Sequence, residues 1–199
     1  MVRKANGGAP GLDRDKIIDQ ALVLLDEEGL EAITTRRLAD RLGVKSPALY
    51  WHFKDKGGLL AAMSERLASV ILSKWRSGAG WGDDMFALGC LIRKEFLGRR
   101  DASRLYLNSA WTDRTAGEFM DVIRKPLLDA GESAERASSV VASVVTFALG
   151  WSAIEQKPER QEAMSGFFDI DESFKQGLRA LLLGLGATLA GDSGPGYAG

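Results

Sequence analysis

The sequence contains little of the chemistry that metal centres and disulfide frameworks require. Its 199 residues include one cysteine, Cys90, and one histidine, His52. One cysteine excludes an internal disulfide and a cysteine-rich zinc site, and it fits a reducing compartment. One histidine excludes most metal sites and catalytic triads that rely on several such side chains. We therefore expect no metal, no cofactor and no catalytic residues, in a cytoplasmic protein.

Long hydrophobic runs and an excess of one charge are also missing. The longest apolar stretch, 140–154, carries three hydroxyl side chains and is shorter than the ~18–20 residues that a bilayer-spanning helix needs. We expect a buried helix there and no membrane segment. No apolar run follows the charged N-terminus, so we expect no signal peptide. With 26 basic and 27 acidic residues the net charge is −1, so contact with nucleic acid would need a local basic patch.

The sequence does show helical periodicity over most of its length, with almost no strand signal. We predict an all-α fold, with a small N-terminal three-helix unit that contains a helix-turn-helix and a larger helical domain after it. The expected parts are a flexible arm (1–12), the helix-turn-helix domain (13–58), the larger domain (59–190) and a disordered tail (191–199). The predicted helices are 12–29, 34–42, 46–52 (capped by Ser46), 56–75, 82–98, 102–109, 113–130 (kinked or split by Pro126), 133–156 and 171–190, with a loop of at most one helical turn at 156–171.

The segment ADRLGVKSPALYWHF has the layout of two short helices joined by a tight turn. Gly43 permits the left-handed conformation that the turn needs, and Val44 and Leu49 supply apolar anchors. Between Thr34 and Lys56 there are six basic and two acidic residues, a local charge of +4 in a chain of −1. A solvated surface could explain the cations alone. It does not explain the turn spacing, the Ser-Pro helix start and the Tyr-Trp pair together.

These residues resemble the DNA-binding domain of the tetracycline-repressor (TetR) family. The resemblance covers 13–60 and is strongest in ITTRRLADRLGVKSPALYWHFKDKGGLL, which holds the family's threonine, Gly-Val turn, Leu-Tyr-x-His-Phe recognition helix and following lysine. It implies base contacts by Arg36, Ser46, Pro47 and Ala48, and phosphate contacts by Thr35, Tyr50, Trp51, His52 and Lys56. Lys45 joins this DNA-binding set from the exposed side of the short helix. Two alternatives remain: a structural, hydrogen-bonded His52, and an apolar shelf made by Tyr50 and Trp51.

The helices 133–156 and 171–190 are too apolar to be ordinary surface helices. The first is hydrophobic around most of its circumference, and the second combines a leucine stripe with glycine and alanine. The TetR family uses the corresponding helices for a four-helix dimer interface. The resemblance therefore implies a homodimer that binds a palindrome in double-stranded DNA. The alternative is the internal core of a monomer.

Aromatic residues are concentrated in the larger domain, where RRDASRLYLNSAWT and FALGWSAIE are similar to the tetracycline-repressor branch of the family. That branch places a histidine and a glutamate at the drug-bound magnesium, and the matching positions here are Tyr106 and Ile154. We therefore reject magnesium–tetracycline as the effector and expect an apolar or aromatic ligand. The alternative is that the aromatics are plain core. The predicted ligand contacts are Tyr106, Asn108, Ser109, Trp111, Phe147, Trp151 and Glu155.

We predict a ligand-responsive transcriptional repressor that binds a palindromic operator as a homodimer and is released by a small, largely apolar effector. An activator, or a regulator without a ligand, would share the fold, and the position of its DNA footprint relative to a promoter would distinguish it. An α-helical enzyme would need a nucleophile with a base, or a metal cluster. The one histidine lies in the predicted DNA-binding segment, which argues against an enzyme.

Overall fold

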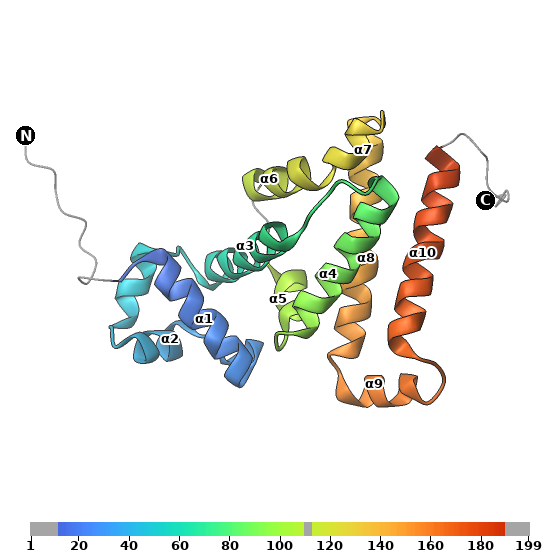
Figure 1. Ribbon diagram of the computed structural model, residues 1–199. Coiled ribbons are helices and arrows are strands. Elements are labelled where there is room, and N and C mark those ends of the chain that lie inside the picture. Colours follow the sequence, from blue (N-terminus) through green and yellow to red (C-terminus); the bar gives the residue numbers. More distant parts are fainter. Residues whose placement is uncertain (1–11, 110–112, 190–199) are drawn as a thin grey trace, which may run out of the picture. The chain divides into compact units, whose positions relative to one another are not determined.

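The computed structural model of the protein describes residues 12–109 and 113–189 (Figure 1). Within these ranges every regular element is a helix and no strand occurs, so the all-α prediction is confirmed. Trp111, the predicted tail 191–199 and, apart from Leu12, the predicted arm lie outside the described residues.

The chain forms two compact units, and the first is assembled from two separate stretches. It comprises the chain up to Leu67 together with 99–112, while the second unit comprises 68–98 and the chain from Asp113 onward. From the sequence we expected one boundary, between 58 and 59, with 102–109 in the larger domain. The structure divides the chain differently because the stretch after residue 98 is bound to the first helix.

The first unit contains α1 (Arg14–Glu28), η1 (Leu30–Ala32), α2 (Thr35–Leu42), η2 (Ser46–Trp51), the start of α3 (Lys56–Lys74) and α5 (Ala102–Asn108). Side-chain oxygens cap the first two α-helices. Asp13 accepts from the N–H of Lys16 at 2.7 Å, and Thr34 accepts from the N–H of Arg37 at 3.2 Å. The core of this unit includes Ile17, Leu25, Ile33, Leu38 and Met63, all fully buried.

The 99–104 segment holds the C-terminal end of α1, where backbone carbonyls lack helical partners. Arg100 donates to one such carbonyl, that of Glu27, at 2.9 Å, and Arg99 donates to the carbonyl of Leu22, further back in the helix, at 3.1 Å. The remaining contacts are Arg99 with Asp26 at 2.7 Å, Asp101 accepting from the N–H of Leu30 at 2.9 Å, and Arg104 with Glu31 at 2.7 Å. Polar contacts therefore keep α5 in the first unit.

The second unit contains the end of α3, α4 (Trp81–Leu97), α6 (Asp113–Ile123), α7 (Lys125–Asp129), α8 (Ala134–Glu155), α9 (Pro158–Ser165) and α10 (Ile170–Leu189). α4 packs along α8 and also against α10. α10 runs antiparallel to α4, because Trp81 at the start of α4 lies beside Gly186 and Arg93 near its end pairs with Asp171. In Figure 1, α9 crosses the ends of α8 and α10.

Local details differ from the sequence predictions at two places. Ser46 is the first residue of η2 and not its cap; Lys45 holds the cap position, and no side-chain hydrogen bond caps this helix. The stretch 156–171, predicted as a loop with at most one turn, contains the eight-residue α9. It starts at Pro158, and proline is favoured at the first helical position. Pro126 lies in the first turn of α7, and the predicted helix 113–130 is split there.

The apolar helix α8 extends beyond the hydrophobic run seen in the sequence. With 22 residues it is long and apolar enough, by length and composition alone, to cross a membrane. One face of it, including Val140, Val141 and Val144, is buried within the second unit, where α8 packs along α4. That packing supports the prediction of a buried helix, because the core helix of a globular protein passes the same test of length and composition.

Candidate nucleic-acid interface

The turn between α2 and η2 has the geometry that the sequence predicts. Gly43 has φ 66° and ψ 28°, the left-handed conformation that glycine adopts without steric cost. The N–H of Val44 donates to the carbonyl of Ala39 at 3.0 Å, which closes the end of α2. Leu49, only 3% exposed, fixes the second helix to the core.

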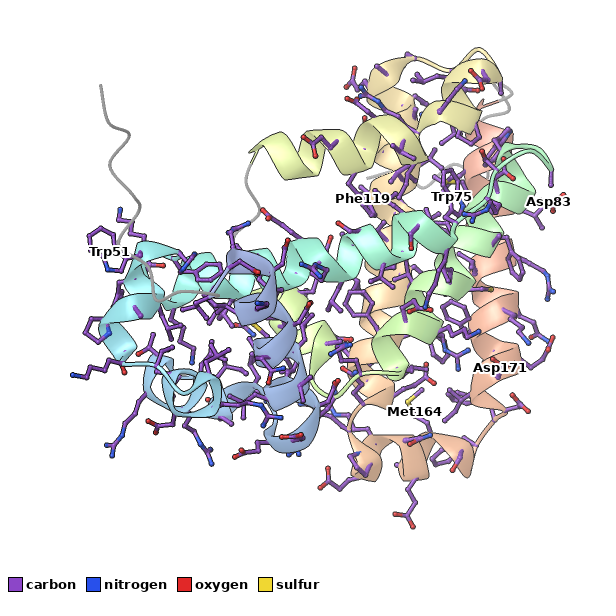
Figure 2. All side chains as sticks on the ribbon, turned by 60° about the vertical axis from the view of Figure 1, so that its left-hand side comes forward. Trp51, Trp75, Asp83, Phe119, Met164 and Asp171 are labelled. Atoms are coloured by element: carbon purple, nitrogen blue, oxygen red, sulfur yellow. The ribbon has the colours of Figure 1, made fainter. Side chains whose placement is uncertain are left out.

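The recognition helix η2 is a 3₁₀-helix, and it presents aromatic side chains to solvent. Tyr50 is 54% exposed and Trp51 is 76% exposed, and Trp51 protrudes from the surface in Figure 2. Pro47 is also exposed, while Ser46 and Ala48 are half-buried. Because most of their surface faces solvent, both aromatic side chains are available for binding.

The cations of this region fall into two groups. Arg37 pairs with Glu28, and Arg41 makes a two-point pair with Glu27 at 2.5 and 3.0 Å. The hydrogen bond with Glu27 raises the pKa of Arg41 and lowers that of Glu27. The side chains of the second group make no hydrogen bond or ion pair with any residue of the described ranges; the group comprises Arg36, Lys45, Lys54 and Lys56. Sequence reasoning missed this division because it depends on the acidic end of α1.

His52 follows η2 and is half-buried. Its Nε2 atom is buried and has no hydrogen-bond partner among the residues that the structure describes. The alternative of a histidine whose Nε2 is satisfied within its own unit therefore has no support here. Thr35, the first residue of α2, is half-buried beside the exposed Arg36.

The predicted ligand residues on α5 and just after it belong to the first unit. Burial raises the pKa of Tyr106 to about 12. The side-chain amide of Asn108 donates to the carbonyl of Arg104 at 2.7 Å. The hydroxyl of Ser109 lies 2.6 Å from that of Ser64, a buried residue of α3 that sequence analysis did not single out. The Ser109 hydroxyl also donates to the carbonyl of Tyr106 at 3.0 Å, so the side chains of Asn108 and Ser109 both have hydrogen-bond partners within the first unit.

The other predicted ligand residues belong to the second unit, where the two aromatics pack against α10 and Glu155 contacts α4. Phe147 and Trp151 form an aromatic cluster with Phe174, at centroid distances of 5.6 and 6.0 Å. Phe168 joins it at 6.4 Å from Trp151. Both oxygens of Glu155 accept hydrogen bonds from Arg93. These contacts favour the packing alternative for the two aromatics and a structural role for the carboxylate.

Two cavities of the second unit lie between α4 and α10. One has a volume of about 910 Å³ and the other of about 390 Å³. Neither is lined by a predicted ligand residue, although Phe174 of the aromatic cluster borders the smaller one. Among the described residues no group of three or more histidine, cysteine, aspartate or glutamate side chains is placed to hold a metal ion.

α8 and α10 each carry an exposed face of small residues. On α8 this face is formed by Ser139, Ala142, Thr146 and Gly150, and a Cβ built at Gly150 meets nothing within 4 Å. On α10 the corresponding residues are Ala180 and Gly184, beside the 75% exposed Leu183. The small side chains therefore leave room for another helix to pack closely against either face.

Comparison with known proteins identifies the family. The family profile described as "Bacterial regulatory proteins, tetR family" matches residues 17–63. The tetracycline repressor protein class C of Escherichia coli is 36% identical over 157 residues, covering 76% of this chain and 69% of that protein.

Solved structures agree with this assignment. A TetR variant from Acinetobacter baumannii AYE in complex with minocycline has a TM-score of 0.76 at 29% identity, covering 89% of this chain and 98% of that chain. BioQ with its double-stranded DNA operator has a TM-score of 0.67 at 27% identity, covering 88% and 99%. The chain belongs to the tetR family of bacterial regulatory proteins and is a transcriptional regulator of the helix-turn-helix class.

Proposed function

We propose that this protein is a ligand-responsive transcriptional repressor that binds a palindromic operator as a homodimer and is released by a small, largely apolar effector. The observation that carries this proposal is the turn at Gly43 between α2 and η2, with free cations and exposed aromatics around it. The class C relative is named a repressor, and BioQ is solved with its operator. The relatives of this chain are regulators and not enzymes. We propose that this chain is likewise a regulator without enzymatic activity, in the cytoplasm.

In this proposal the exposed side of α2 and η2 reads the operator. Arg36 binds a base edge, most naturally the O6 and N7 atoms of guanine, because its fork suits that pair of acceptors. Ser46, Pro47 and Ala48 face bases, and the latter two contact thymine methyl groups. The phosphate contacts fix the register of the protein on the duplex; they are made by Thr35, Tyr50, Trp51, His52 and Lys56, and Lys45 binds DNA beside them.

The dimer forms through the small-residue faces of α8 and α10. Two copies of these faces build a four-helix interface that is related by two-fold symmetry. The same symmetry places two copies of η2 on one duplex, so the operator is a palindrome with half-sites about one helical turn or slightly more apart.

The effector is small and largely apolar. Tyr106 and Ile154 stand where a magnesium–tetracycline site would need histidine and glutamate, and the one histidine of the chain, His52, follows η2. Magnesium–tetracycline is therefore not the effector that we propose, although a relative is solved with minocycline. The predicted contacts remain Tyr106, Asn108 and Ser109 in the first unit, Phe147, Trp151 and Glu155 in the second, and Trp111, which lies outside the described residues.

Selection of random duplexes by the purified protein tests the proposal. We expect the bound fragments to share a palindrome, and we expect affinity to fall by about 0.9 log unit per phosphate contact for each log unit of salt. Fragments without a common sequence would contradict operator recognition. Mapping the palindrome relative to a promoter then distinguishes a repressor, whose site overlaps the promoter, from an activator, whose site lies upstream.

A further inference from the structure

The larger cavity of the second unit is an open groove between the first half of α4 and the second half of α10. Its large side chains are Trp81 and Phe86 from α4 and Leu182 and Leu183 from α10. Leu183 is 75% exposed in the single protomer and lies at the edge of the α10 face that the proposed dimer uses. Gly186 lies beside Trp81, because a Cβ built there would be in ordinary van der Waals contact, 3.5 Å, with the indole ring. The groove therefore offers a mainly apolar surface to a ligand.

Arg179 lines this groove. Its guanidinium carbon lies over the ring of Phe86, 4.8 Å from the centroid. Glu172 approaches the guanidinium only to 4.0 Å, which is beyond hydrogen-bond distance. The Arg179 side chain donates no hydrogen bond to any residue within 12–109 and 113–189. A guanidinium carries five N–H donors in a planar fork that matches a carboxylate, so this side chain is free to receive an anion.

Asp83 limits the charge of the ligand. It lines the groove from the first turn of α4, where Figure 2 labels it, and the helix dipole favours an acidic residue there. Asp83 and Arg179 form no ion pair in the described structure. A second anionic group on the ligand would be repelled by this carboxylate. The lining therefore fits a molecule with an apolar body and a single anionic headgroup.

We propose that the α4–α10 groove is a binding site for a small amphipathic carboxylate. The headgroup pairs with Arg179, and the apolar body lies along Trp81 and Leu182. The volume of about 910 Å³ is within the range of ligand pockets, roughly 300–1,000 Å³. None of the residues assigned to the effector lines this groove, so the site is additional to the proposed function and does not depend on it.

Binding of decanoate to the full-length protein, measured by titration calorimetry, tests the proposal. Decan-1-ol and decylammonium share the apolar body and differ in charge, and we expect decanoate to bind most tightly. Arg179→Gln should weaken decanoate binding about tenfold, the loss of one charged hydrogen bond, and leave decan-1-ol unchanged. Asp83→Asn should tighten decanoate binding. Arg136→Gln removes an exposed cation in the first turn of α8 that does not line the groove, so it should have no effect.

Fluorine NMR of the protein labelled with 5-fluorotryptophan locates the ligand. We expect decanoate to shift the Trp81 resonance, assigned by its loss in Trp81→Phe, and not that of Trp51. Equal losses in Arg179→Gln and Arg136→Gln, or a shift at Trp151 in place of Trp81, would overturn the proposal. The proposal would also be overturned if decanoate did not bind and the protein formed an assembly larger than a dimer that Leu183→Glu dissociates. A second copy of the chain would then occupy the groove.

Discussion

Arg93 of α4 and Glu155 of α8 form a buried two-point ion pair, in which Nε and Nη2 of the arginine each donate to one carboxylate oxygen at 2.8 Å. The two side chains are 11% and 4% exposed. The remaining arm of the guanidinium donates to Asp171 at 2.6 Å, and the group lies over the ring of Phe174. Figure 2 shows Asp171 near the start of α10. One side chain therefore joins the end of α8 and the start of α10 to α4.

Arg93→Met should destabilise the protein by about 3–5 kcal/mol, because it leaves the carboxylate of Glu155 buried without a partner. Urea unfolding monitored by circular dichroism measures the effect. Lys125→Met, which removes an exposed pair with Asp129, is the matched control and should cost about 0–1 kcal/mol. The double variant Arg93→Met with Glu155→Leu should recover most of the stability. A loss as small as that of the control would contradict a stabilising role for the buried pair.

Arg36 and its neighbour Arg37 should differ in their effect on operator binding. Arg36→Ala should cost about 1–3 kcal/mol of operator affinity and relax one base position. Arg37 is paired with Glu28, so Arg37→Ala should change the sequence preference little. Lys56→Ala should weaken all sequences alike, as the loss of a phosphate contact does. Titration of operator and random duplexes provides the measurement, and equal losses on both for Arg36→Ala would remove its base-reading role.

A charge on the free face of α10 should dissociate the dimer. Leu182, which the leucine stripe suggests as a target, is 7% exposed within its own protomer, so a charge there would disturb folding as well. Ala180→Glu and Ala142→Glu alter the exposed faces instead. We expect unchanged helicity, a monomer in light scattering and loss of operator binding. Ala134→Glu, at the exposed start of α8, should remain dimeric; a wild type that is monomeric at micromolar concentration would refute the interface.

Tyr106 should make stability depend on alkaline pH. Its pKa in the folded protein is about 12, above the value of roughly 10 in an unfolded chain. Below pH ~10 both states keep the proton, so this group has no effect there. Between about pH 10 and 12 only the unfolded state loses it, so stability falls as the pH rises. Urea midpoints of wild type and Tyr106→Phe should diverge above pH ~10, and parallel curves would contradict burial of the phenol.

Local rules were sufficient to predict the recognition turn from the sequence. Thr34 caps α2 and Gly43 adopts a positive φ, since both outcomes depend on one or two residues. The sequence of the same region predicts its positive charge but not which of its cations form ion pairs. A list of arginines does not reveal that Glu28 takes Arg37 while Arg36 stays free, because the acidic residue comes from another helix. The role of Glu155 was missed for the same reason, as its partner Arg93 lies 62 positions away along the chain.

The 99–104 segment has a consequence for how this protein can be recombined with its relatives. A chimaera with a single junction after Leu67 would take the residues up to Leu67 from one parent and the arginines that bind α1 from the other. Asp26 and Glu31 would then lie opposite the other parent's residues in place of Arg99 and Arg104. Gly29 would likewise lie against the other parent's residue at position 101, where Asp101 now leaves little space. A functional first unit can therefore be exchanged only if residues 99–112 are replaced together with residues 12–67, as two separate inserts in the rest of the chain.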